Sequence, residues 1–202
     1  MNNILSKTSF KQCEVCAYHE SGHILFAYLC GYRCRHAQLI KDSGEEGYSS
    51  IAIIDYGKDS LIASKFLSNH ANIDTFNTFP LSQKLDSVEV GRRIARIFLG
   101  GSVAAAVYKN DGNVHIPLPI QIEYVDLLRV EFIQCVINEI SSENEEDFIE
   151  NGLQDALYTF NNINVWNTVA DLAKRLLQSN ELSQNDVEEC LDEHGILYDS
   201  GS

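Results

Sequence analysis

The spacing of apolar side chains along the chain predicts a mainly helical protein. Apolar residues recur every three or four positions over most of the sequence, which is the period of one helix face. The helices predicted in this way cover residues 59–69, 81–109, 120–140, 148–160, 163–178 and 183–194. Gly100 and Gly101, followed by further small residues, allow the segment 81–109 to pack very closely against a neighbour, either as one helix or as two abutting ones.

Two shorter runs, residues 36–41 and 50–55, have the aliphatic character of strands. A stretch rich in Gly, Ser and acidic residues joins them and predicts a turn, so we expect an antiparallel pair. The fold class is therefore mainly α, of the α+β type, with a small antiparallel hairpin or sheet. Such a pair could hold an extended substrate at its edge by main-chain hydrogen bonds, or could only cover the core, and the sequence leaves both readings open.

A further helix is predicted over residues 13–31, which read CEVCAYHESGHILFAYLCG and are apolar on nearly all sides. Thr8 or Ser9 can cap its start, and Gly31 can end it. A helix with this composition is expected to be buried. Polar side chains within it therefore need partners, because an unpaired buried polar group costs a few kcal/mol.

The polar residues in this helix form an H-E-x-x-H sequence, His19 to His23. Residues four apart lie on the same helix face, so His19 and His23 can direct ring nitrogens to one metal ion at roughly 2.0–2.1 Å. Glu20 is turned off that axis and can reach a water molecule beside the metal, as a general base must. The alternative is a pair of core histidines hydrogen-bonded to carbonyl groups, with Glu20 at the surface.

Asp126 is the other conspicuous polar residue, because it lies among apolar side chains of the predicted helix 120–140. A buried, ionised carboxylate requires a cation or several hydrogen-bond donors. The sequence therefore predicts a positively charged group beside Asp126.

The composition limits the classes of partner. The chain has 202 residues, a mass of 22.7 kDa, a formal net charge of -14 and a pI of about 4.7. Such a charge argues against nucleic acid or an anionic membrane surface as a partner. No stretch reaches the roughly 18 uncharged apolar residues that a membrane span needs, and the first residues lack the apolar core of a signal peptide. We therefore expect a cytoplasmic protein whose six cysteines are free thiols.

One domain is expected over residues 8–195, with short flexible tails, 1–7 and 196–202, at its ends. Within that domain, residues 8–140 contain the predicted helix with His19 and His23, the strands and the long helices that follow. The last helices occupy residues 144–195.

Several segments resemble, in order, the peptidase domain of FtsH-type ATP-dependent zinc proteases. Residues 17–31 are similar to the family's A-x-H-E-A-G-H-A-x-x-A-x-x-x-G. Residues 98–105 are similar to its L-G-G-R-A-A-E-E segment, and residues 123–127 fall where the family has N-D-L. Residues 172–182 are similar to L-A-x-x-L-L-E-x-E-T-L, so the likeness extends over nearly the whole chain.

The resemblance implies a zinc metalloendopeptidase in which His19, His23 and Asp126 hold Zn²⁺ and Glu20 is the general base. Glu123, and after it His115, are alternatives for the third ligand. The implied reaction is hydrolysis of peptide bonds in a peptide or an unfolded protein by a water that the metal activates.

The chain also departs from the family pattern. Ala105 and Ala106 replace two glutamates, and the T-T-G-A before the family's aspartate is absent. The chain has no G-x-x-x-x-G-K-[ST] phosphate loop, so any ATPase that delivers substrate would belong to a separate chain. These departures leave open an alternative function, a catalytically silent, zinc-braced module for binding or assembly.

Overall fold

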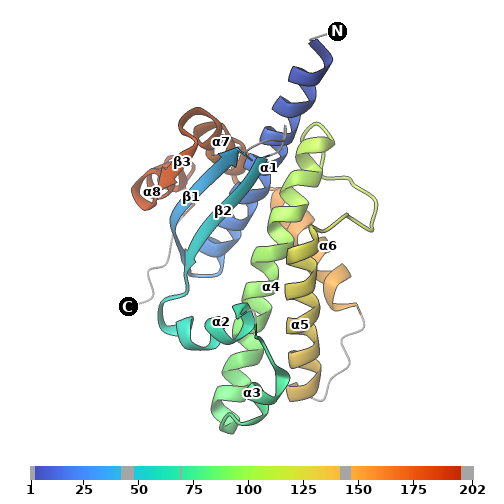
Figure 1. The fold of residues 1–202 in the computed structure, drawn as a ribbon, viewed down its shortest axis with the longest axis vertical. Helices are drawn as coiled ribbons and strands as arrows, with labels where there is room; N and C mark the ends of the chain where they lie inside the picture. Colours follow the sequence, from blue (N-terminus) through green and yellow to red (C-terminus); the bar gives the residue numbers. More distant parts are fainter. Residues whose placement is uncertain (1–2, 42–47, 69, 142–146, 197–202) are drawn as a thin grey trace.

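Helices dominate the fold, and a three-stranded antiparallel sheet lies beside the first of them (Figure 1). This computed structural model describes residues 3–41, 48–68, 70–141 and 147–196, and only the backbone of residues 3–11. The predicted turn after residue 41 and the extreme ends of the chain lie outside the described residues. The predicted fold class, mainly α with a small antiparallel sheet, is confirmed.

The first helix, α1 (Asn3–Leu29), runs through the centre of the fold and contacts the sheet and two other long helices. It begins at Asn3, earlier than the expected caps Thr8 and Ser9, because the sequence before residue 22 contains no Gly or Pro that would stop it. It ends as predicted, just before Gly31, whose φ of 80° lies in the left-handed region that glycine adopts most readily.

The sheet has the strand order β2-β1-β3, with β1 (Arg33–Lys41) in the middle. The predicted antiparallel pair is present: β2 (Tyr48–Asp55) pairs with β1 in a register that places Ala37 opposite Ala52. The third strand, β3 (Glu181–Ser183), was not predicted, because three residues are too few to show an alternating pattern. β2 is left as an edge strand of the sheet and lies along α1.

One long helix packs against α1, and a second long helix packs on the first. α4 (Leu81–Lys109) is one continuous helix, and α5 (Tyr124–Ser141) returns alongside it (Figure 1). The predicted close packing occurs where Gly22 of α1 meets α4, since a Cβ atom at Gly22 would lie 2.5 Å from the carbonyl oxygen of Gly100. The absence of side chains at these positions lets the two helices approach far enough for residues of both to share one site.

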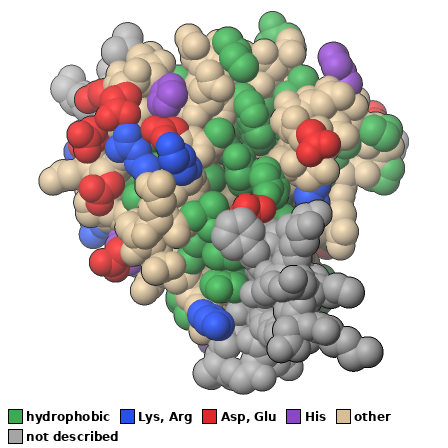
Figure 2. Space-filling model, turned by 90° about the horizontal axis from the view of Figure 1, so that it is seen from above, with side chains coloured by type: hydrophobic (Ala, Val, Ile, Leu, Met, Phe, Trp, Pro, Cys, Tyr) green, Lys and Arg blue, Asp and Glu red, His purple; other side chains and the backbone are tan. Residues whose placement is uncertain are grey.

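The remaining elements cover this core. They are η1 (Gly57–Asp59), α2 (Ser60–Leu67), α3 (Ile73–Asn77), α6 (Phe148–Phe160), α7 (Ile163–Ser179) and α8 (Gln184–Glu193). Ser183 caps α8 in a reciprocal arrangement with Asp186. From above, hydrophobic side chains form a stripe across the middle of the molecule (Figure 2).

Two further observations concern the membrane and the cysteines. Among the described residues, no helix is both long and apolar enough to cross a membrane. All six cysteines are free thiols, as expected.

Candidate metal centre

The two histidines of α1 point into one site. Their Nε2 atoms are 2.8 Å apart, and both side chains are buried, each residue being 8% exposed. This arrangement follows from the spacing of four residues on a helix, which stacks the two rings on one face. The prediction that His19 and His23 present nitrogens to a common point agrees with the geometry.

A hydrogen bond from α4 fixes which nitrogen of His23 faces the site. Nδ1 of His23 lies 2.8 Å from the carbonyl oxygen of Ile97. A carbonyl oxygen only accepts, so Nδ1 carries the hydrogen and donates it. In the neutral ring Nε2 then has a free lone pair directed at the site, which is the tautomer a metal ligand needs.

The helix packing also makes room for this ring. A Cβ atom at Gly101 would lie 2.4 Å from Cε1 of His23. A side chain at position 101 would therefore displace the imidazole. Gly100 therefore allows the close approach of α1 and α4, and Gly101 leaves the space that the His23 ring occupies.

Asp126, in the first turn of α5, completes the group. Its Oδ2 atom lies 3.2 Å from Nε2 of His19 and 3.3 Å from Nε2 of His23. Asp126 is 6% exposed, and this oxygen accepts no hydrogen bond from any described group. A buried carboxylate oxygen without a donor is costly, so this oxygen requires a positively charged partner.

The electrostatics of the metal-free site reflect the same need. Burial disfavours the charged form of Asp126, but the two imidazoles beside it hold its pKa well below its usual range. Burial would also lower the pKa of His23, but Asp126 outweighs this effect and raises the pKa to about 9. Without a metal, a proton on His23 therefore supplies the positive charge that Asp126 requires.

Glu20 lies beside the histidines and is held by the sheet. Oγ of Ser50, on β2, donates a hydrogen bond of 2.9 Å to Oε1 of Glu20. A carboxylate oxygen of Glu20 and one nitrogen each of His19 and His23 lie within 4.8 Å of one another. Glu20 is only 5% exposed, which argues against the alternative that places it at the surface.

The two alternatives for the third ligand differ in position. Oε2 of Glu123 lies 3.2 Å from Nε2 of His19, but the Glu123 side chain is 61% exposed. His115 is exposed and belongs to none of the metal-ligand clusters among the described residues. The geometry therefore favours Asp126 over Glu123, and Glu123 over His115.

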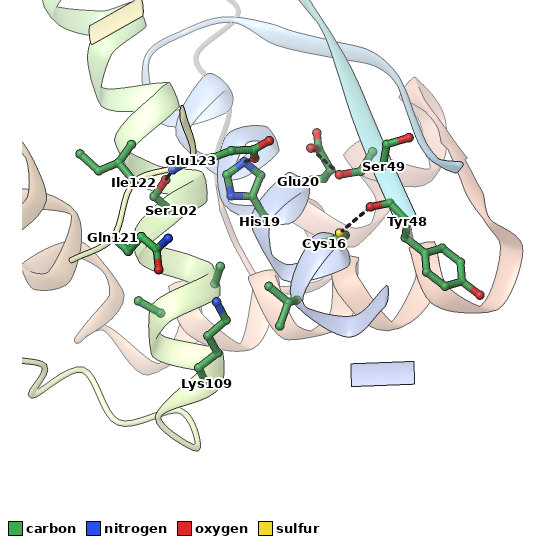
Figure 3. A pocket seen from close by; sticks show the side chains of 14 residues that line it. Cys16, His19, Glu20, Tyr48, Ser49, Ser102, Lys109, Gln121, Ile122 and Glu123 are labelled. Carbon is green, nitrogen blue, oxygen red and sulfur yellow. Dashed lines mark hydrogen bonds and ion pairs between the residues drawn. The ribbon is translucent and has the colours of Figure 1, made fainter. Parts of the chain in front are cut away.

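A cavity of about 480 Å³ opens beside His19 and Glu20, between α1, α4 and β2 (Figure 3). Cys16 lies in its wall, one turn before Glu20, and its thiol donates to the carbonyl oxygen of Tyr48 at 3.5 Å. Tyr18, Tyr124 and His115 do not line this cavity.

The sequence did not single out several residues of the cavity wall. Ser50 could have been found, because alternation in a strand places residues 48, 50 and 52 on one face. Ser102 and Gln121 carry no such signal, and they reach the cavity only through the packing of α4 and the extended segment before α5.

The donor atoms of His19, His23 and Asp126 fit a metal ion. A tetrahedral ion with bonds of about 2.0–2.1 Å separates its ligand atoms by about 3.3 Å. The three separations measured here are 2.8, 3.2 and 3.3 Å. The buried oxygen of Asp126 would gain the cation it lacks, and the cavity provides an open side.

Comparisons with known proteins give no further assignment. No protein-family model, curated protein or solved structure matches this chain.

Proposed function

We propose that the protein is a zinc-dependent metallopeptidase that hydrolyses peptide bonds in peptides or unfolded proteins. The observation that carries the proposal is the meeting of three buried donor atoms, from His19, His23 and Asp126, with the Glu20 carboxylate beside them. Two imidazoles and one carboxylate form a ligand set typical of catalytic zinc, which leaves a fourth position open.

Glu20 is the general base of the proposed reaction. Bound zinc supplies Lewis acidity and lowers the pKa of a water molecule to about 7. Glu20 accepts the proton of the attacking water on a carboxylate oxygen and then delivers it to the nitrogen of the leaving amine. Ser50 keeps Glu20 in position through its hydrogen bond to Oε1.

The edge strand β2 is the proposed binding site for the substrate backbone. It lies along α1 and borders the cavity at residues 48–50, while residues 52, 54 and 56 border a second hollow of about 270 Å³. This second hollow reaches His23 and is lined mainly by apolar side chains, including Leu67 and Phe98. An extended peptide added to β2 would place side chains on both sides of the metal group.

The resemblance to the FtsH-type peptidase domain supports the same function through the H-E-x-x-H sequence and the position of Asp126. The alternative, a silent zinc-braced module, does not require a buried carboxylate beside the ligands. The position of Glu20 therefore favours the peptidase.

The test combines metal analysis with hydrolysis of casein. The purified protein should contain one zinc per chain, and Glu20→Gln should retain the metal while hydrolysis falls by about 10²–10⁴-fold. Glu131→Gln, an exposed residue of α5, is the matched control and should leave both unchanged. Bound zinc with hydrolysis that does not depend on Glu20 would refute the peptidase and favour the silent module.

Ser50→Ala tests the position of Glu20. Loss of one hydrogen bond to a charged group should reduce kcat about five- to fiftyfold, with zinc content unchanged. The control is Ser64→Ala, since Oγ of Ser64 contacts only a carbonyl oxygen of its own helix among the described residues. An unchanged kcat in Ser50→Ala would show that Glu20 acts without this support.

A further inference from the structure

The cavity beside the metal group is a groove between matching faces of α1 and α4. Ser102, Ala105, Ala106 and Lys109 of α4 line it, and their spacing of three, four and seven residues places them on one helix face. Val15, Cys16, His19 and Glu20 line the opposite side. Since Gly22 lies near Gly100 and Tyr108 donates to Glu14, the two helices are antiparallel, and the groove leads away from His19 toward Lys109.

The middle of this groove is open because two of its residues are small. Ala105 and Ala106 stand where the resembled family has two glutamates. Glutamates at these positions would narrow the groove and add negative charge to a wall that already carries Glu20 and Glu123. The two methyl groups instead leave space that a substrate side chain can enter.

Lys109 closes the far end of the groove. It is the only cationic side chain among the described residues that line the cavity, and it has no ion pair with any described residue. Its side chain extends along α4 toward the part of the cavity where Gln121 and His19 lie (Figure 3). Seven residues separate it from Ser102, which corresponds to about 10 Å along the helix axis.

The charges of the groove therefore differ between its ends. Carboxylates surround the proposed metal group, and the one lysine of the described cavity wall stands at the other end, about 10 Å along α4 from Ser102. An extended peptide rises about 3.3 Å per residue, so this distance spans about three residues of substrate. A carboxylate is the group that gains most from this ammonium, because the chain as a whole, with a formal net charge of -14, repels carboxylates elsewhere.

We propose that Lys109 is a specificity-determining residue, which binds a substrate carboxylate within about three residues of the scissile bond. The inference rests on the proposed peptidase function, and it narrows the substrate class to peptides with an acidic group on one side of the cleaved bond. The acidic group is an Asp or Glu side chain or the C-terminal carboxylate of the peptide. Both are carboxylates, and the experiment below uses an amidated peptide to tell them apart.

The experiment begins with a peptide mixture from a tryptic digest of denatured cell protein, in which mass spectrometry locates each cleaved bond. Wild type should show Asp and Glu enriched at one position within about three residues of the cut. A matched pair of internally quenched peptides then carries Glu or Gln at that position. A third peptide is the Gln peptide with an amidated C-terminus, so it lacks both the acidic side chain and the C-terminal carboxylate.

For wild type, kcat/KM for the Glu peptide should exceed that for the Gln peptide about three- to fivefold, mainly through KM, since a partly exposed ion pair contributes up to about 1 kcal/mol. Lys109→Met should abolish the preference, and Lys109→Glu should reverse it. High salt should weaken the preference in wild type. Lys174→Glu, an exposed residue of α7 beside a different hollow, makes the same change of net charge and should keep the wild-type preference.

Binding measurements separate failure of this inference from failure of the proposed function. The Glu and Gln peptides are titrated into Glu20→Gln protein by fluorescence anisotropy, with and without Lys109→Met. If the ratio of kcat/KM for the Glu peptide to that for the Gln peptide is the same in wild type and Lys109→Met, the role of Lys109 is overturned and the proposed peptidase function stands. No cleavage by wild type would overturn the peptidase, and the anisotropy of one peptide with a free or an amidated C-terminus, with and without Lys109→Met, would then decide on the role of Lys109.

Discussion

Two groups of side chains in the described part of the chain place metal-binding atoms close together, one in α1 and α5 and one in α7 and α8. In the first, the atoms of His19, His23 and Asp126 lie within 3.3 Å of one another. In the second, the ligand atoms of Asp171, Cys190 and His194 lie within 4.8 Å of one another. On donor types alone, the second group, with a thiol, an imidazole and a carboxylate, is as good a candidate for zinc.

The two groups differ in how their charge is balanced. Nε of Arg175 lies 3.2 Å from Oδ2 of Asp171, so the second group already contains a cation. The Cys190 thiol donates to the same oxygen, and burial raises its pKa to about 12, which keeps it protonated and a poor ligand. In the first group no Lys or Arg contacts Asp126 in the described part of the chain, and one carboxylate oxygen has no donor. Proximity of donor atoms therefore marks a metal site only where the charge is still unbalanced.

The largest expected difference between the two groups is in metal content. Asp126→Ala and His23→Ala should each lose the bound zinc, because a site with two ligands left binds far more weakly. Asp171→Ala and His194→Ala are the matched controls and should retain one zinc per chain by elemental analysis. Zinc lost in the second pair and kept in the first would reverse the assignment of the two groups.

Metal binding at the first group should depend on pH. The neighbouring Asp126, against the effect of burial, raises the pKa of His23 from 6.5 to about 9, so zinc must displace a proton below that pH. Affinity should rise about tenfold per pH unit for one displaced proton and level off as pH approaches the raised pKa. Competition with a chromophoric chelator at several pH values measures this slope. A slope of zero would show that His23 is neutral before zinc binds.

The same pKa values predict how the metal-free protein responds to pH. A histidine with a raised pKa contributes its stabilisation fully below about pH 6.5, and that contribution is lost as pH rises through about 9. The lowered pKa of Asp126 acts in the opposite direction, and its contribution is lost as pH falls below the ordinary carboxyl range. Urea unfolding of the metal-free protein should therefore show lower stability at both extremes, and His23→Gln should remove the decrease between about pH 6.5 and 9.

Gly101→Ala should separate packing from metal binding. The new Cβ atom would lie 2.4 Å from His23, so the ring must move, and zinc affinity should fall about tenfold or more. Gly152→Ala is the matched control, since its Cβ atom would lie 2.4 Å from Cδ1 of Leu99, away from the metal group. Both variants should lose about 1–3 kcal/mol of unfolding free energy from overpacking. Equal zinc affinity in the two variants would contradict the role given to Gly101.

The smallest expected effect concerns the cation of the second group. Arg175→Met should lower the free energy of unfolding by about 1 kcal/mol or less, since its ion pairs are partly exposed. If a resident cation is what keeps zinc away from Asp171, a second and weaker equivalent of zinc should then appear in a titration. Unchanged stoichiometry in this variant would show that the buried, protonated thiol of Cys190 is by itself enough to exclude the metal.

The sequence alone located the long helices, the strand pair and part of the site. Helical periodicity located the long helices, because they are long enough to repeat their apolar face several times, but it left open whether α4 is one helix or two. The spacing of four residues between His19 and His23 fixed their common face before any tertiary contact was known. The buried position of Asp126 within an apolar helix also indicated a missing cation.

Only the tertiary structure decided which distant residues meet the face of α1 that carries His19 and His23. The approach of α4 at Gly101 and the carbonyl oxygen of Ile97 determine the position and tautomer of His23. The edge position of β2 brings Ser50 to Glu20, and Lys109 reaches the same cavity from the last turn of α4. Local periodicity reports which side of an element is buried but not which other element covers it, because that depends on helix packing and strand order. The sequence therefore located the histidine pair and Glu20, and the packing of α4, α5 and β2 around this part of α1 assembled the rest of the site.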